Sequence, residues 1–191
     1  MAEEKALTDA HLVELAKTDP ESFGLLMERY QGQLSGYIRR LTRLSPDDVQ
    51  DLLQEVFIKI YQNLNAYDRD LKFSSWAYRI AHNQVVDYFR RSGARPQTDV
   101  LEDYEWEKIV GGGIQLEKYI VNKDCAEKVK ACIEDLPLNY REILILRFVE
   151  EKEYEEIMDI LKKPKGSVAT LIARGKEILR SKMEERNINC F

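Results

Sequence analysis

The sequence is poor in the residues that bind transition metals or form disulfide bonds. Its 191 residues include three cysteines and two histidines. Cys125, Cys132 and Cys190 are dispersed and form no Cys-x-x-Cys pair. This pattern argues against a zinc site and fits a reducing compartment better than an oxidising one. We therefore expect no metal and no cofactor.

Long apolar runs are also missing. No stretch approaches the roughly 18 apolar residues that indicate a membrane-spanning helix. The N-terminal segment MAEEKALTDAHLVEL is acidic and lacks the apolar core of a signal peptide. These absences predict a cytoplasmic protein without membrane insertion. The formal net charge of −5 argues against unspecific coating of nucleic acid, although local basic patches remain compatible with it.

Patterns typical of common enzyme classes are absent as well. The segment PKGSV at residues 164–168 lacks the spacing of a P-loop. The glycine run at residues 111–113 does not connect a predicted strand to a predicted helix. The sparse histidines and cysteines indicate no pairing of a nucleophile with a base. We expect a protein without catalytic activity.

Helical periodicity runs through most of the chain, and strand alternation is absent, so the pattern predicts an all-α fold. Ser45 and Pro46 form a helix start signal, and Pro137 and the segment LKKPKG interrupt later helices. Residues 96–124 contain seven acids and three bases. We predict two small helical domains, residues 1–95 and 125–191, joined by an acidic flexible linker, residues 96–124.

The helix expected over residues 48–65 has one apolar residue in the middle of its polar side. At 100° per residue, one side collects the apolar residues Val49, Leu52, Leu53, Val56, Phe57, Ile60 and Leu64. The opposite side collects Asp51, Gln54, Glu55, Ile58 and Gln62. A polar rim around an apolar anchor is typical of protein interfaces. Isolated exposed apolar residues are also common on surfaces without a function.

The helix expected over residues 74–91 places an aromatic residue among basic ones. The inward stripe is Ala77, Tyr78, Ala81, Val85, Tyr88 and Phe89, and the outward side holds Trp76, Arg79, Asn83, Asp87 and Arg90. Residues 69–95 carry six bases, including Arg69 and Lys72, and two acids. Arginines neutralise phosphates, and aromatic or amide side chains bind unpaired bases. The alternative is that Trp76 and Ile80 pack against the preceding helices.

The segments over residues 154–161 and 166–182 predict a helix-turn-helix. The second helix buries Val168, Leu171, Ile172, Gly175, Ile178, Leu179 and Met183, and Gly175 permits close approach of another helix. Its outward side holds Ser167, Thr170, Ala173, Arg174 and Lys176, with Lys165 just before it. Residues 162–182 contain seven bases and one acid. Such a helix fits the DNA major groove, although helix-turn-helix units also serve as packing or dimer elements.

Four stretches together resemble a known family. They are DLLQEVFIKIYQNLNAYD, KFSSWAYRIAHNQVVDYFRR, LPLNYREILILRFVEEKEYEEIMDIL and KGSVATLIARGKEILR. The chain resembles the ECF-type (extracytoplasmic function) RNA polymerase sigma factors, with a sigma-two-like domain followed by a sigma-four-like domain. The resemblance implies a promoter-specificity subunit that binds core RNA polymerase and promoter DNA, helps to melt the DNA, and is controlled by an anti-sigma factor.

The resemblance also implies a role for each surface. The polar side of residues 48–65 would dock on the β′ clamp helices of the polymerase, through Asp51, Gln54, Glu55, Ile58 and Gln62. The minus-10 promoter element would be bound by Arg69, Lys72, Trp76, Arg79, Asn83 and Arg90. The minus-35 element would be bound by Lys165, Ser167, Thr170, Ala173, Arg174 and Lys176. The second domain would also contact the β flap, and the linker would run toward the RNA exit channel.

The helix over residues 166–182 departs from the family pattern at two positions. Ala169 stands where the family usually has a lysine, and Leu171 stands where it usually has an arginine. Part of the usual phosphate contact is therefore missing. The main alternative function is a transcription regulator that binds duplex DNA through its C-terminal helices and uses the N-terminal ones for sensing or dimerisation. That alternative leaves Trp76 and the bases near it without a role.

Overall fold

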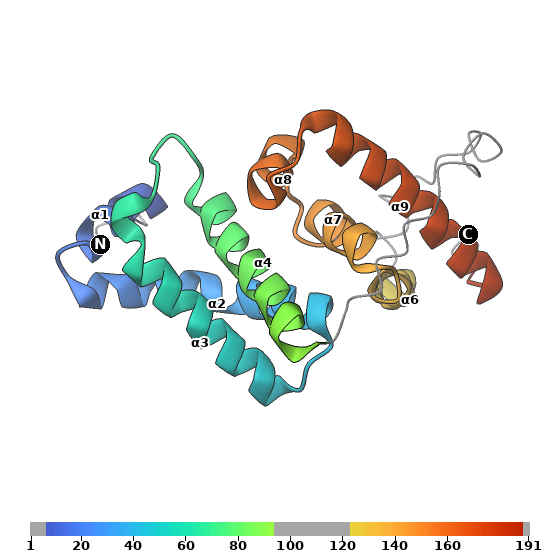
Figure 1. Ribbon diagram of the computed structural model, residues 1–191, viewed down its shortest axis with the longest axis horizontal. Helices are drawn as coiled ribbons and strands as arrows, with labels where there is room; N and C mark the ends of the chain where they lie inside the picture. The colour runs from blue at the N-terminus through green and yellow to red at the C-terminus, as the bar shows by residue number, and fades with distance from the viewer. Residues whose placement is uncertain (1–6, 94–122, 189–191) are drawn as a thin grey trace, which may run out of the picture. The chain divides into compact units, whose positions relative to one another are not determined.

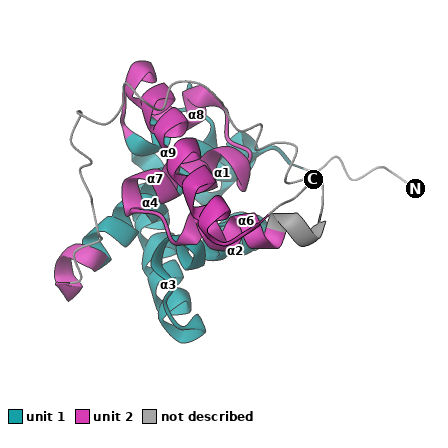
Figure 2. Ribbon diagram, turned by 90° about the vertical axis from the view of Figure 1, so that its right-hand side faces the viewer, with its two compact units in different colours: residues 1–88, 159–161 teal, residues 89–158, 162–191 magenta. Residues whose placement is uncertain are grey.

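The computed structural model describes residues 7–93 and 123–188, and all regular elements within these two ranges are helices (Figure 1). The predicted all-α fold is therefore confirmed. The chain forms two compact units, residues 1–88 with 159–161 and residues 89–158 with 162–191 (Figure 2). Most of the predicted acidic linker, including the glycine run, lies outside the described residues. Within the described ranges, no helix has the length and apolarity needed to cross a membrane.

Unit 1 is built from α1 (Asp9–Ala16), α2 (Pro20–Thr42), α3 (Pro46–Gln62), the short 3-10 helix η1 (Leu64–Ala66) and α4 (Phe73–Ser92, in this unit up to Tyr88). Local signals begin three of the helices. The side chains of Thr8, Asp19 and Ser45 accept hydrogen bonds from backbone N–H groups in the first turns of α1, α2 and α3. The start signal at Ser45 and Pro46 is confirmed.

The core of unit 1 lies along α2, which packs against α1 and α3. Tyr37 of α2 and Tyr78 of α4 are both fully buried, with ring centroids 5.1 Å apart. The other wholly buried side chains include Leu34, Ile38 and Leu41 of α2, Val56 of α3, and Ala77 and Ala81 of α4. Burial of these apolar side chains is the main stabilising contribution to the unit.

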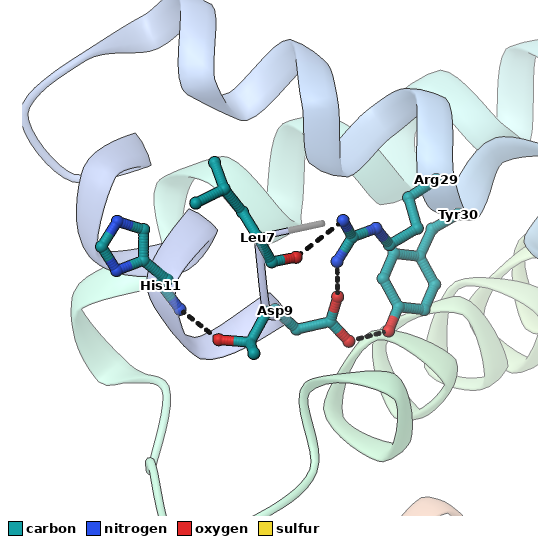
Figure 3. A network of polar contacts seen from close by, with 6 residues as sticks. Leu7, Asp9, His11, Arg29 and Tyr30 are labelled. Carbon is teal, nitrogen blue, oxygen red and sulfur yellow. Dashed lines mark hydrogen bonds and ion pairs between the residues drawn. The ribbon is translucent and has the colours of Figure 1, made fainter. Parts of the chain in front are cut away.

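A charged hydrogen-bond network attaches α1 to α2 (Figure 3). The Asp9 carboxylate accepts from Arg29 Nη1 at 2.5 Å and from the Tyr30 hydroxyl. Arg29 Nη2 also donates to the Leu7 carbonyl at 2.8 Å. Burial, and then the hydrogen bond to Asp9, raise the pKa of Tyr30, so this hydroxyl stays protonated and remains a donor.

Unit 2 contains α6 (Lys123–Glu134), α7 (Leu138–Phe148), α8 (Tyr154–Leu161, in this unit up to Met158) and α9 (Lys165–Glu185). Reciprocal hydrogen bonds of Glu153 and Glu156 form a capping box at the start of α8. Lys162, in the left-handed region with φ 51°, ends α8, and Pro164 precedes α9. The predicted helix-turn-helix is confirmed.

Gly175 lies where α9 crosses α7, as predicted. A Cβ atom at Gly175 would lie 3.1 Å from Cγ of Leu144 and 3.3 Å from both of its terminal methyl carbons. Leu144 is fully buried, so it would have to shift within the core to make room for this atom. The absence of a side chain at this position therefore sets how closely the two helices approach.

We predict that Gly175→Ala lowers the free energy of unfolding. Overpacking a filled core costs about 1–3 kcal/mol, which over most of that range exceeds the gain of about 1 kcal/mol in helix propensity. Gly166→Ala is the matched control, because no atom lies within 4 Å of its added Cβ. Urea unfolding of the full chain should show a lower midpoint for Gly175→Ala alone. Equal stability of the two variants would contradict the close contact.

We also predict that the free energy of unfolding decreases as pH rises, because of Glu142 of α7. This carboxyl is 6% exposed, and burial raises its pKa from 4.5 to about 7, although the charge of Lys163 lowers it. The folded state then binds more protons than the unfolded state between these two values, so stability declines as pH rises from about 4.5 to about 7.

Glu142→Gln should remove this decline and leave a flatter stability profile. The expected change is up to roughly 3 kcal/mol between pH 4.5 and pH 8. The measurement is urea unfolding at several pH values. Glu155→Gln, at an exposed position of α8, is the control and should keep the decline. A Glu142→Gln profile that falls as steeply as that of the wild type would contradict the prediction.

Candidate protein and nucleic-acid interfaces

The outer side of α3 presents the residues that the periodicity places there. Ile58 is 55% exposed, and Asp51, Gln54, Glu55 and Gln62 are exposed around it. We call these five residues the docking face. The apolar stripe on the other side of the helix is buried, from Val49 to Ile60. The burial pattern predicted for this helix is therefore confirmed.

Tyr61 extends the apolar part of this surface and was missed by sequence reasoning. It is 45% exposed, one turn from Ile58, and its ring packs against Phe23 of α2 with centroids 5.0 Å apart. The signal in the sequence was its i+3 spacing from Ile58. With Phe23 beneath it, Tyr61 is oriented but remains accessible. It adds aromatic area next to the docking face.

Trp76 does not lie on the outward side of α4. It is only 5% exposed, and its ring centroid lies 5.3 Å from that of Tyr67 and 5.7 Å from that of Phe73. The ring of Tyr30 packs against Phe73 with centroids 5.3 Å apart. The outward placement of Trp76 is therefore wrong, and its alternative, packing against the preceding elements, is correct. The cause is Tyr67, which follows η1 and packs on Phe73 and Trp76 in the first turn of α4.

The loop between η1 and α4 is ordered by its own hydrogen bonds. The Tyr67 hydroxyl donates to the Leu71 carbonyl at 2.5 Å, and the Asp68 carboxylate accepts from the Asp70 N–H at 3.0 Å. Burial raises the pKa of Tyr67, which keeps this donor protonated. These hydrogen bonds stabilise the loop conformation in which its charged side chains are exposed.

The basic residues predicted for this region are accessible. Arg69 and Lys72 of the loop and Asn83 and Arg90 of α4 are exposed, and Arg79 is half-buried. Arg79, Asn83 and Arg90 share one side of α4, because their spacings of four and seven residues match the helix period. Arg69 forms an ion pair with Glu14 of α1. A hydrogen bond from Lys17, and then Arg69, hold the pKa of Glu14 below its usual value.

The start of α9 offers a small-residue surface flanked by bases. Lys165, Ser167, Thr170 and Ala173 are exposed, and Arg174 is half-buried. The Thr170 hydroxyl donates to the Gly166 carbonyl at 2.9 Å. Small side chains here allow a base edge to come close to the helix, as major-groove binding requires.

Lys176 contacts an aromatic ring of its own unit. Its Nζ lies 4.8 Å from the ring centroid of Phe148 of α7, and the residue is half-buried. This cation–π contact orients the ammonium group beside α7. The predicted buried stripe is confirmed for Val168, Ile172, Gly175, Leu179 and Met183, whereas Leu171 and Ile178 are half-buried.

No cluster of three or more histidine, cysteine or acidic side chains that could bind a metal ion occurs within the described residues. The free thiol of Cys132 is buried, and Arg186 Nη1 lies 3.7 Å from its sulfur. The candidate interfaces in the described part of the chain are the exposed sides of α3, α4 and the start of α9.

Two family models match the chain, Sigma-70 region 2 at residues 26–95 and Sigma-70 region 4 at residues 126–179. Among solved structures, the chain is similar to CnrH, solved in complex with the cytosolic domain of CnrY (TM-score 0.66, 22% identity, 93% of this chain and 97% of that chain). It is also similar to the sigma factor RpoE of Bartonella quintana, solved with the anti-sigma factor NepR (TM-score 0.62, 16% identity, 86% and 98%). At these identities, both show a shared fold.

The similarity to characterised sequences is higher. The chain is 34% identical to the ECF RNA polymerase sigma-E factor of Escherichia coli K12 over 184 residues, which is 93% of this chain and 95% of that protein. The match includes both helical units and the order in which they occur. The chain belongs to the ECF family of RNA polymerase sigma factors.

Proposed function

We propose that this chain is a non-catalytic, cytoplasmic promoter-specificity subunit of RNA polymerase. It binds core polymerase through the docking face, binds the minus-10 element through α4 and its preceding loop, and binds the minus-35 element through α9. The observation that carries this proposal is Ile58, 55% exposed within a polar face. A regulator that binds only duplex DNA would need such an anchor only for dimerisation, and it leaves the exposed bases of α4 and its preceding loop without a role.

The docking face has the composition of an interface centre. Ile58 supplies apolar area, and the acids and amides around it supply hydrogen-bond donors and acceptors. Two of the five residues, Asp51 and Glu55, are acidic, so the face is complementary to a basic partner surface. This composition supports the assignment of α3 to the β′ clamp helices.

The minus-10 contact combines phosphate and base binding. Arg69, Lys72, Arg79 and Arg90 contact the backbone, and Asn83 binds an unpaired base. Trp76 supports the loop from beneath rather than stacking on a base, since its ring is buried among Tyr67 and Phe73. In the free chain Arg69 forms an ion pair with Glu14, and on DNA binding it contacts a phosphate instead.

The minus-35 contact is made by Lys165, Ser167, Thr170, Ala173 and Arg174, with Lys176 at the edge of the surface. The family-model matches at residues 26–95 and 126–179 support a sigma-two-like domain over residues 1–95 and a sigma-four-like domain over residues 125–191, with residues 96–124 as linker. The second domain also contacts the β flap.

An anti-sigma factor is the partner that we propose for regulation. The two structural relatives were each solved in a complex, one with the cytosolic domain of CnrY and one with the anti-sigma factor NepR. A protein that covers the docking face would block polymerase binding. The proposed partner therefore competes with core polymerase for α3.

The proposal is tested by reconstituted transcription. The purified chain and core polymerase are incubated with a promoter selected by the holoenzyme from a random library, and run-off RNA is measured. We expect RNA only when both proteins are present. Duplex binding by the chain without initiation would favour the regulator, and catalytic turnover without polymerase would favour an enzyme.

Ile58→Glu should lower affinity for core polymerase by tenfold or more. A buried charge at the centre of an interface loses the apolar contact and is desolvated without a partner. Leu25→Glu is the matched control, because Leu25 is 47% exposed on α2 and is not part of the docking face. Fluorescence anisotropy of the labelled chain measures the affinity of both variants for core polymerase. Equal affinities of the two variants would show that the docking face is misassigned.

Arg174→Ala should weaken minus-35 binding by the holoenzyme and reduce the salt dependence of that binding by about one unit of slope. Arg180→Ala is the matched control, because Arg180 lies two turns further along α9 and forms an ion pair with Glu184 at 2.9 Å. The measurement is affinity for selected promoter DNA at several salt concentrations. An unchanged slope for Arg174→Ala would remove Arg174 from the groove contact.

A further inference from the structure

Gln84 of α4 has an amide in a position where the helix otherwise buries apolar side chains. It is 2% exposed and is one of three buried polar or charged residues among the described ones. Its neighbours on the inward side include Ala77, Ala81 and Val85. An apolar side chain of similar volume would fill this position without a polar group to satisfy, so packing alone does not require the amide.

Both ends of this amide bind charged side chains of α3. Gln84 Nε2 donates to Glu55 Oε2 at 2.8 Å, and Gln84 Oε1 accepts from Lys59 Nζ. Lys59 also lies 3.9 Å from Asp87, one turn further along α4. Hydrogen bonds to charged groups are roughly twice as strong as neutral ones. The amide therefore joins α3 and α4 by directional contacts that fix their register.

The two helices joined in this way carry different surfaces. Glu55 belongs to the docking face, and Asn83, adjacent to Gln84 in the chain, belongs to the minus-10 surface. Glu55 is exposed and has three rotatable side-chain bonds, so an unrestrained carboxylate would lose conformational freedom on binding polymerase. The bond from Gln84 restricts that freedom before the partner arrives.

We propose that Gln84 is a positioning residue, which orients Glu55 for core polymerase and links the docking face to the minus-10 surface. The proposal rests on the function proposed above and adds a residue that touches neither partner. It acts through Glu55 on the polymerase side and through the register of α4 on the DNA side.

The test compares Gln84→Met with Glu55→Gln and with the double variant. Methionine keeps the length of the side chain and removes both amide contacts. We expect Gln84→Met to weaken core binding about fivefold. Because Gln84 acts through Glu55, the double variant should be little weaker than Glu55→Gln alone. Gln33→Met, at an exposed position of α2, is the control and should bind like the wild type.

A second variant separates positioning from folding. Gln84→Glu keeps an acceptor for Lys59 but places a carboxylate against that of Glu55, so it should weaken core binding more than Gln84→Met. Urea unfolding of each variant, with affinity measured under conditions where all are folded, gives the comparison. Gln84 variants that are less stable but bind core polymerase with unchanged affinity would overturn the proposal. It would also be overturned if the affinity losses of Gln84→Met and Glu55→Gln multiplied in the double variant.

The effect on DNA binding is measured with core polymerase that is saturated with each variant. Gln84→Met should lower its affinity for a forked minus-10 template about threefold, whereas Gln33→Met should not. Unchanged affinity for the fork would overturn the link between the surfaces. If the wild-type chain fails to bind core polymerase, the proposed function fails. Suppose that the wild type binds core polymerase and that Ile58→Glu lowers this affinity. If Gln84→Met then leaves the affinity unchanged, only the positioning role of Gln84 fails.

Discussion

The loop before α4 depends on one cluster of aromatic side chains in unit 1. Its members are Tyr30, Tyr67, Phe73 and Trp76. Phe73 and Trp76 begin α4, Tyr67 ends η1, and Tyr30 comes from α2, so one aromatic cluster joins three elements. The loop of residues 68–72 leaves and re-enters this cluster. Both ends of its backbone therefore lie at this cluster, and its charged side chains are exposed.

The network around Asp9 connects α1 to the same cluster, because Tyr30 belongs to both (Figure 3). A second link runs from Glu14 to Arg69 of the loop. Helix α1 therefore has two links to this region. Glu14 forms an ion pair with the loop, and Asp9 accepts a hydrogen bond from Tyr30 of the aromatic cluster. Unit 2 is organised more simply, around the close approach of α7 and α9 at Gly175.

Much of this was predictable from local pattern. The period of α3 separates its core from the docking face, and a glycine within the apolar stripe of α9 predicts a close helix crossing. A helical wheel places Trp76 wrongly because it assumes one buried side, whereas Tyr67 covers a second side at the start of α4. Gln84 was not foreseen either, since its burial depends on Glu55 and Lys59, which precede it by 29 and 25 residues. Periodicity contains no information about such distant polar partners.

The burial of Trp76 gives the protein an internal optical reporter. The chain has two tryptophans, Trp76 and Trp106, so replacing Trp106 with phenylalanine leaves a single indole within the aromatic cluster. Emission from an indole depends on the polarity around it, and the neighbouring tyrosines can transfer excitation energy to it. Rearrangement of the loop when DNA strands separate would therefore change the colour and intensity of the emitted light, without any attached dye.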